Sequence, residues 1–166
     1  MKMAKKLLAV ILAGVLTLSV LTGCGGAVST KAIAEAMSDK TIAEAMSDKS
    51  KEDGVVYQAV PELDEKARLI AEMINAPGKI TDIYGEIMKI MGDDYADKYV
   101  WIAATTTNGN NVMTQASNLL EDVDIDGNIN SDVAEGSPAK VRCIGTATIT
   151  VNGVDYRFAV ITADAE

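Results

Sequence analysis

Apolar residues recur at helical spacing in three segments of the chain. The first begins at Pro61 and stops at Ala76-Pro77-Gly78, the second is capped by Thr81 and ends at Gly92, and the third starts at Asn111. Steps of three or four residues put apolar side chains on one face of a helix. We therefore predict three helices, the first two paired as a hairpin. Their apolar faces comprise Leu63, Ala67, Ile70, Ala71 and Ile74, then Ile83, Tyr84, Ile87, Ile90 and Met91, then Val112, Ala116, Leu119 or Leu120, and Val123.

The carboxyl end instead alternates with a period of two around Asn152-Gly153, a pair that favours a two-residue type I′ turn between antiparallel strands. Pairing about this turn places apolar residues or glycine opposite one another on one face. The other face pairs Thr150 with Asp155 and Thr148 with Arg157, as expected of a solvated surface. The predicted pairs on the apolar face are Val151/Val154, Ile149/Tyr156, Ala147/Phe158 and Gly145/Val160.

Two strands alone are marginally stable, so we expect a third strand in the same sheet. Residues 99–107 are one candidate, because Tyr99-Val100-Trp101-Ile102 suits a strand, although the acidic residues before it resemble a helix start. Residues 55–60 are the other candidate. The predicted fold class is a small single α+β domain over residues 55–166. In it a helical hairpin and a further helix pack on one face of an antiparallel sheet that ends in the C-terminal β-hairpin.

The segment before this domain contains a tandem duplication. The octapeptide IAEAMSDK occupies residues 33–40 and again residues 42–49, with a step of nine residues. Two copies cannot build a repeat core, and the Ser and Asp that end each copy compete with helix formation. We therefore expect residues 24–54 to form a flexible tether. The alternative is a partner-binding amphipathic helix with one apolar side, formed by Ile33, Met37, Ile42 and Met46.

The first 26 residues carry the features of an export signal. Three lysines, at positions 2, 5 and 6, precede the apolar or hydroxylated residues 7–21, a stretch too short for a comfortable membrane span. Leu21-Thr22-Gly23-Cys24 follows and resembles the lipobox of bacterial lipoproteins. This resemblance implies that residues 1–23 are a signal peptide, and that Cys24 carries acyl chains such as palmitate. It also implies a secreted protein held on the outer face of the cell membrane, in the cell envelope. An ordinary signal peptide or a short transmembrane anchor is the alternative.

The composition of the chain limits which partners it can bind and which catalytic mechanisms it can use. Loss of residues 1–23 removes three of the 15 basic residues and none of the 24 acidic ones, which leaves a net charge of −12. Such a surface repels nucleic acid and anionic lipid and favours cations as partners. The chain has no histidine, which excludes Ser-His-Asp and Cys-His nucleophiles and imidazole zinc sites. If Cys24 is lipidated, Cys143 has no disulfide partner, and we expect it to be a small buried hydrophobe.

One acidic segment, DVDIDGNINSDV at residues 122–133, resembles the calcium loop of EF-hand and dockerin proteins over its first nine positions. The resemblance implies a turn at Gly127 and oxygen ligands around a calcium ion. Val133 stands where that family has a bidentate glutamate, and no helix is expected to follow. The alternative is a solvated acidic turn between a helix and the sheet. The candidate calcium ligands are Asp122, Asp124, Asp126, Asn128, Asn130 and Asp132.

Two further clusters carry possible chemistry. Asp93-Asp94 and Asp97 could supply paired carboxylates for glycosidase-type catalysis, but we interpret them as charges at a helix start. Trp101 with Tyr95 and Tyr99 could form a sugar-stacking patch, whereas aromatic residues at this spacing more often belong to a core.

These observations favour a noncatalytic binding or interaction module, anchored to the membrane through its lipid, whose partner is an envelope protein or a small ligand. No catalytic residue is predicted. The alternatives are a calcium-dependent surface or adhesion module that acts through residues 122–132, and an envelope hydrolase that uses carboxylates.

Overall fold

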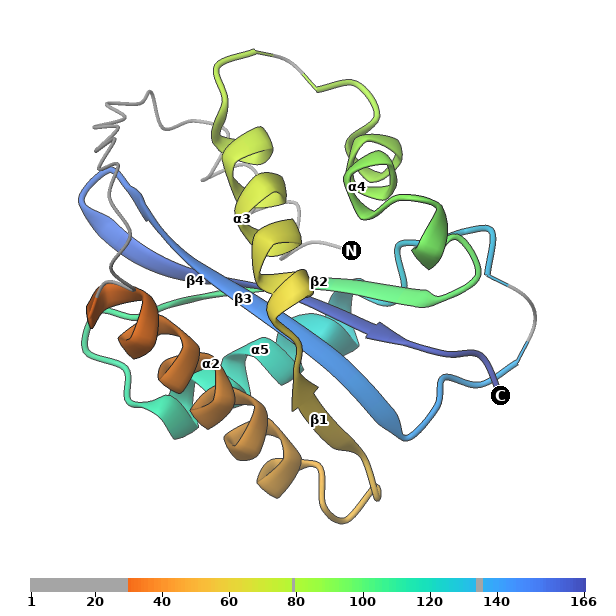
Figure 1. Cartoon of the computed structure of the whole chain (residues 1–166), viewed down its shortest axis with the longest axis horizontal. Helices are drawn as coiled ribbons and strands as arrows, with labels where there is room; N and C mark the ends of the chain where they lie inside the picture. The colour runs from red at the N-terminus through yellow and green to blue at the C-terminus, as the bar shows by residue number, and fades with distance from the viewer. Residues whose placement is uncertain (1–29, 79, 134–135) are drawn as a thin grey trace.

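The computed structural model describes residues 30–78, 80–133 and 136–166, so the predicted export signal and Cys24 lie outside the described part of the chain. The α+β prediction is confirmed, with helices on both faces of a sheet (Figure 1). No helix within these ranges is long and apolar enough to cross a membrane. In chain order the elements are α2 (Thr30–Lys49), β1 (Val56–Ala59), α3 (Pro61–Asn75), α4 (Ile83–Met91), the 3₁₀ turn η1 (Asp93–Tyr95), β2 (Tyr99–Thr106), α5 (Val112–Asp126), β3 (Val141–Val151) and β4 (Val154–Ala163).

The strands described form one mixed sheet in the order β1-β3-β4-β2. Both predicted candidates for a third strand are present, as β1 and β2. β4 pairs antiparallel with β3 and with β2, whereas β1 runs parallel to β3, so the prediction of a purely antiparallel sheet is wrong. The physical reason is the connection between them. A tight hairpin forces an antiparallel pair, but β1 reaches β3 through three helices and another strand, which permits a parallel pairing.

The C-terminal hairpin has the predicted register, with Val151 opposite Val154 and Gly145 opposite Val160. Asn152 and Gly153 have φ values of 52° and 77°, the left-handed conformations that a type I′ turn requires. The prediction that its second face is solvated is wrong for most of β4. Arg157 is only 7% exposed, because a second pair of helices covers this face.

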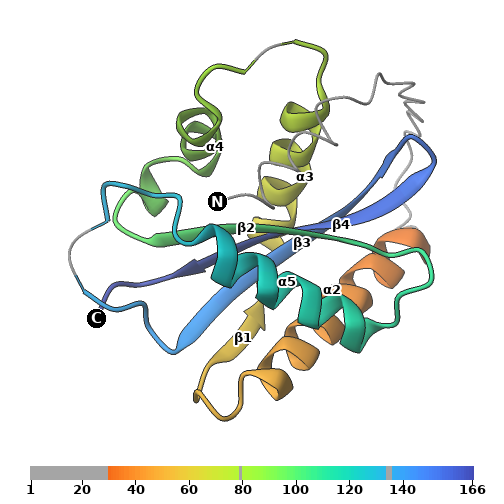
Figure 2. The same cartoon turned by 180° about the vertical axis from the view of Figure 1, so that it is seen from behind.

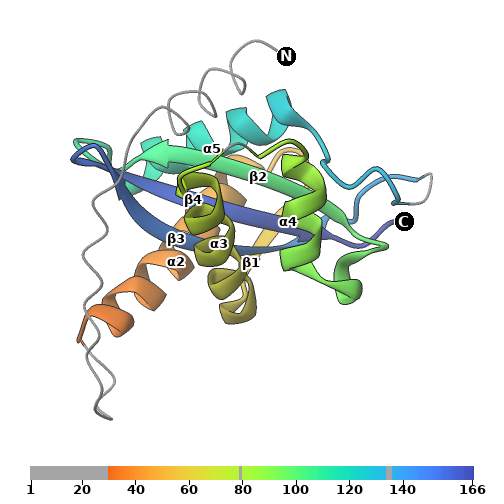
Figure 3. The ribbon, with the colours of Figure 1, turned by 90° about the horizontal axis from the view of Figure 1, so that it is seen from above.

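The helices divide between the two faces of the sheet, which corrects the prediction that they all lie on one. The α3 and α4 helices lie side by side over one face (Figure 3), and their apolar residues pack against Phe158 and Val160 of β4. The α2 and α5 helices cross the other face (Figure 2), where Ala159 and Ile161 of the same strand are buried. β4 is therefore covered from both sides.

Close contacts fix α3 and α4 in place. A Cβ at Gly145 of β3 would lie 2.1 Å from the backbone of Leu63, so only glycine allows α3 to approach the sheet this closely. Lys66 of α3 donates hydrogen bonds to the last carbonyls of α4, at Ile90 (2.7 Å) and Met91 (2.8 Å). The partial negative charge at the C-terminus of a helix favours a cation in this place. The cap of α4 is Asp82, which accepts from the Gly85 N–H, and not the expected Thr81.

The expected flexible tether is wrong for residues 30–49, because they form α2. Ile42 and Met46, from the second copy of the octapeptide, are fully buried against α5 and the sheet. Met37, the equivalent of Met46 in the first copy, is 67% exposed. Nine residues correspond to two and a half helical turns, so Met37 and Met46 lie on opposite sides of the helix. The alternative prediction placed Met37 on one apolar side with Ile42 and Met46, and that placement is wrong, because Met37 is exposed whereas the other two are buried.

Candidate functional site

The acidic segment that resembles a calcium loop does not form such a loop over its first five residues. α5 continues through Asp126, so Asp122, Asp124 and Asp126 lie on a helix, and the chain turns only at Gly127. Asp122 points to the sheet, where its Oδ2 accepts a hydrogen bond from the N–H of Ala104 at 3.0 Å. Burial raises the pKa of the Asp122 carboxyl, and this hydrogen bond opposes that rise.

The side chains of Asn128 and Asn130 also form hydrogen bonds with backbone groups. Oδ1 of Asn128 accepts from the N–H of Val100 (2.9 Å), and the Ile129 N–H donates to the carbonyl of Val100 (2.8 Å). The Asn130 side chain, 3% exposed, donates to the carbonyls of Ala96 (3.0 Å) and Lys98 (2.8 Å). Together with Asp122, these residues hydrogen-bond the outer edge of β2 and the chain that leads into it.

The six candidate calcium ligands therefore do not converge on one point. Asp124 and Asp132 are exposed, and burial raises the pKa of the half-buried Asp126. Across residues 30–78, 80–133 and 136–166, no three acidic or cysteine side chains are placed to hold a metal ion together. Calcium binding stays a prediction.

The other residues singled out in the sequence occupy separate places. Asp93, Asp94 and Asp97 are exposed around η1. Cys143 is half-buried on the α3 side of β3, less buried than expected, and burial raises the pKa of its thiol. Tyr95 lies on the same side as Cys143, apart from Tyr99 and Trp101.

Tyr99 and Trp101 are stacked on the face of β2 that α5 covers, with ring centroids 5.6 Å apart and planes at 14°. Trp101 is only 6% exposed, as expected of a core residue. What covers its ring is the guanidinium of Arg142 from β3, whose Cζ lies 4.9 Å from the ring centroid. This contact joins a charged residue to the aromatic pair.

Arg142 and Tyr57 are the residues that sequence reasoning missed. Tyr57 of β1 is the register partner of Arg142. Arg142 comes directly before Cys143, which pairs with Thr162, so one further step of the antiparallel register sets Arg142 opposite Ala163. The small Ala163 side chain leaves space for the arginine to extend across β4 to Trp101. The sequence signal that could have found Arg142 is the alternation of side chains along a strand. Arg142 and Ile144 are two residues apart and lie on the same face, which places an arginine beside an apolar surface.

The guanidinium of Arg142 has few partners. Its Nη1 donates to the Tyr57 hydroxyl at 3.3 Å, and its Cζ lies 5.9 Å from the Tyr57 ring centroid. Its Nε is buried and has no hydrogen-bond partner. Within the described residues no carboxylate lies within ion-pair distance of this arginine. A charged group placed in this way is a candidate binding site, since buried donors are normally satisfied.

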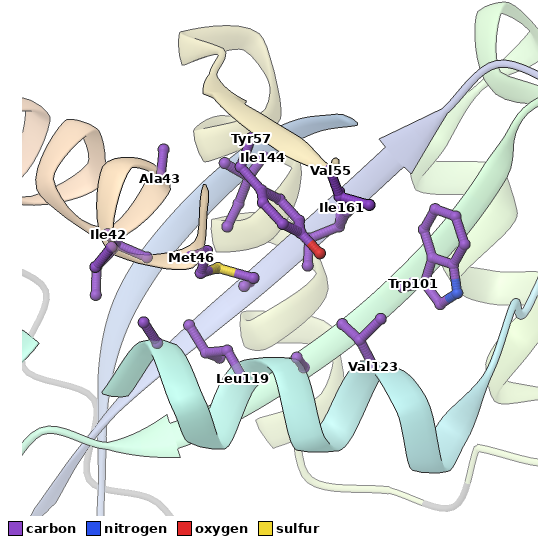
Figure 4. Packing of buried hydrophobic residues seen from close by; sticks show 14 of the residues in the cluster. Ile42, Ala43, Met46, Val55, Tyr57, Trp101, Leu119, Val123, Ile144 and Ile161 are labelled. Atoms are coloured by element: carbon purple, nitrogen blue, oxygen red, sulfur yellow. The ribbon is translucent and has the colours of Figure 1, made fainter. Parts of the chain in front are cut away.

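Both neighbours of β1 contact Tyr57, which pairs with β3 on one side and with α2 on the other. Its backbone N–H donates to the hydroxyl of Ser47 in α2 at 2.8 Å, which closes the outer edge of β1. Burial raises the pKa of the Tyr57 hydroxyl, and the nearby Arg142 opposes the rise. Figure 4 shows Tyr57 above the sheet with its hydroxyl directed towards the side where Trp101 lies. The pair Arg142 and Tyr57, with Trp101 and Tyr99, is called the Arg142 site below.

The chain matches no protein-family model, no curated protein and no solved structure, so the functional argument stands on its sequence and on this geometry.

Proposed function

We propose that the chain is a lipid-anchored, extracytoplasmic binding module that acts without catalysis and recognises its ligand or envelope partner through the Arg142 site. The observation that carries this proposal is the guanidinium of Arg142, which is held on Trp101 and has no carboxylate partner among the described residues. Holding an arginine at an apolar face without an ion pair costs stability, which a binding role would explain.

The lipid anchor follows from the resemblance of residues 21–24 to a lipobox. Five residues, 25–29, separate Cys24 from the start of α2 at Thr30, and six peptide steps span at most about 20 Å. The module is thus held close to the membrane surface and not at the end of a long spacer.

The direction of α2 sets which end of the module is near the anchor. Ser38 accepts a hydrogen bond from Arg157, in the half of the sheet that carries the β3–β4 turn, and Ser47 contacts Tyr57 of the Arg142 site. Figure 1 has the first turn of α2 and the β3–β4 turn at the same end of the molecule. Thr30 and Ser47 are 17 residues apart, about 25 Å along a helix, so the Arg142 site faces away from the anchored end.

Expression of the whole chain with Cys24→Ser in a bacterial host tests the anchor. The unaltered chain should sediment with membranes, leave them only in detergent, and yield an acylated amino-terminal peptide that begins at Cys24. The Cys24→Ser chain should yield no acylated peptide, and Cys143→Ser, the matched control, should behave as the unaltered chain. An unmodified amino terminus at another residue in the unaltered chain would overturn the anchor.

A further inference from the structure

We propose that the Arg142 site binds a ligand through a single carboxylate group; this rests on the binding function proposed above and names the chemistry of its ligand. The site would take a small monocarboxylate or a carboxylate group of a larger envelope molecule. Four features of the site support this assignment.

The donors at the site outnumber their acceptors. A guanidinium has five N–H donors, and Arg142 uses one of them, in the 3.3 Å hydrogen bond to Tyr57. The indole N–H of Trp101 has no hydrogen-bond partner in the described structure either. The plane of two adjacent guanidinium N–H groups matches the two oxygens of a carboxylate, the geometry of the strongest arginine contacts.

The guanidinium is held in place before a ligand arrives. It lies against the Trp101 ring at 4.9 Å and the Tyr57 ring at 5.9 Å, and both rings are buried in the core on the α2 and α5 side. Contact with two rings restrains a long side chain that would otherwise lose rotamer freedom on binding. A fixed donor pair binds more tightly than a mobile one.

The surroundings favour one negative charge and disfavour more. Among the described residues Arg142 is the one cation that contacts these rings, while Asp124 lies near enough to influence the Tyr57 hydroxyl. α5 ends beyond Asp124, and Ser50, which follows α2, also contacts Tyr57, so two helix C-termini with partial negative charge flank the site. A monoanion neutralises Arg142, whereas a phosphate dianion would leave an excess charge beside these groups.

The last feature is the exposure of the indole N–H of Trp101. Trp101 is 6% exposed, and its indole N–H has no hydrogen-bond partner in the described part of the chain. Among the described residues the one fully buried side-chain nitrogen or oxygen without a partner is Nε of Arg142, so the indole nitrogen is not fully buried. The exposed part of Trp101 therefore includes the N–H. A carboxylate that meets the guanidinium edge can accept from this indole as well, because the Cζ of Arg142 lies 4.9 Å from the Trp101 ring centroid.

Trp101 is the only tryptophan of the chain, so its fluorescence reports directly on the site. The experiment titrates the mature lipidated protein, in detergent and at constant pH and ionic strength, with sodium acetate and separately with inorganic phosphate, using chloride as the balancing ion. Acetate should change the Trp101 emission saturably, and phosphate should need a several-fold higher concentration.

Variants locate the effect. Arg142→Met keeps the contact with Trp101 and removes the charge, and should weaken acetate binding at least about tenfold, as loss of a charged hydrogen-bonded pair predicts. Arg142→Lys should weaken it less. The control is Arg68→Met, which removes an exposed arginine of α3 that pairs with Glu65 and Glu72 and should leave the titration unchanged.

A second measurement needs no variant. The chain has arginines only at positions 68, 142 and 157, and acetate should shift the Nε–H resonance of Arg142 alone. Tighter binding of phosphate than of acetate would overturn the carboxylate assignment and leave the binding function standing. The absence of any response at Trp101 and Arg142 to both anions would overturn the site itself, whatever the fate of the lipid anchor.

Discussion

The two outer edges of the sheet are closed in different ways, and both closures come from segments whose sequence suggested another role. β1 is closed by one hydroxyl, that of Ser47, in a helix whose sequence looked like a tether. β2 is closed by a carboxylate and an amide, from Asp122 and Asn128, in a segment that looked like a calcium loop. An exposed strand edge is a site of unwanted pairing, so polar side chains near a strand can be selected to close it. Acidic or hydroxylated motifs beside a sheet should be compared with this structural role before a ligand is assigned.

The largest effect is expected at the residue that docks α2 and so positions Ser47. Met46→Ala should lower the free energy of unfolding by about 2–5 kcal/mol, because Met46 is fully buried against α5 and the sheet. Met37→Ala, in the identical octapeptide, is the matched control and should change it by less than about 0.5 kcal/mol. Urea denaturation of the two variants measures the difference, and equal losses would show that α2 is not docked as described.

The chain that leads into β2 should respond strongly to loss of Asn130. Asn130→Ala removes the amide that holds the carbonyls of Ala96 and Lys98 and should cost about 2–3 kcal/mol in unfolding free energy. Ser131→Ala, at an exposed neighbouring position, should cost little. Thermal unfolding compares the pair, and a stable Asn130→Ala protein would contradict the role of Asn130 in holding the chain that leads into β2.

A smaller effect is expected at the β1 edge, because a single hydroxyl closes it. Ser47→Ala leaves the N–H of Tyr57 without its acceptor and should cost about 1 kcal/mol. The control is Thr41→Ala, whose hydroxyl donates to the Met37 carbonyl on the exposed side of the same helix. Amide hydrogen exchange adds a local readout: the Tyr57 amide should exchange faster in Ser47→Ala and at the usual rate in Thr41→Ala.

The smallest effect concerns pH. Burial raises the pKa of Asp122, so between the ordinary aspartate pKa and the raised value the folded chain holds a proton that the unfolded chain has lost. The free energy of unfolding therefore falls as the pH rises through this range. Asp122→Asn can still accept from the Ala104 N–H and does not titrate, so it should reduce the fall. Identical pH profiles for the two proteins would remove Asp122 from this account.

Local sequence patterns predicted most of the elements, and long-range packing explains what they missed. The helical spacing at α3, α4 and α5 and the Asn152-Gly153 turn act over a few residues, so they could be interpreted from sequence. The parallel pairing of β1 with β3, about 85 residues apart, leaves no local signal. The same holds for α2: the two octapeptides are identical in sequence, yet Met46 is buried in the core and Met37 is exposed.

The candidate site was less accessible to sequence reasoning than the fold. Trp101 and Tyr99 were noticed as aromatic residues and assigned to a core, which their burial supports. Arg142 gained its position from its partner Tyr57 in β1 and from the small Ala163 on β4, and neither lies near it in sequence. The acidic motif could be recognised but not interpreted, since the use of Asp122 and Asn128 depends on where β2 lies.

Trp101 emission from the mature protein reconstituted in phosphatidylcholine vesicles tests the central claim, a carboxylate-binding site on the end of the module away from its lipid anchor. Acetate added outside the vesicles should change the emission as it does in detergent, and bromine-labelled lipid chains should leave it unquenched. Strong quenching by brominated lipid together with no response to acetate would contradict both the orientation and the site.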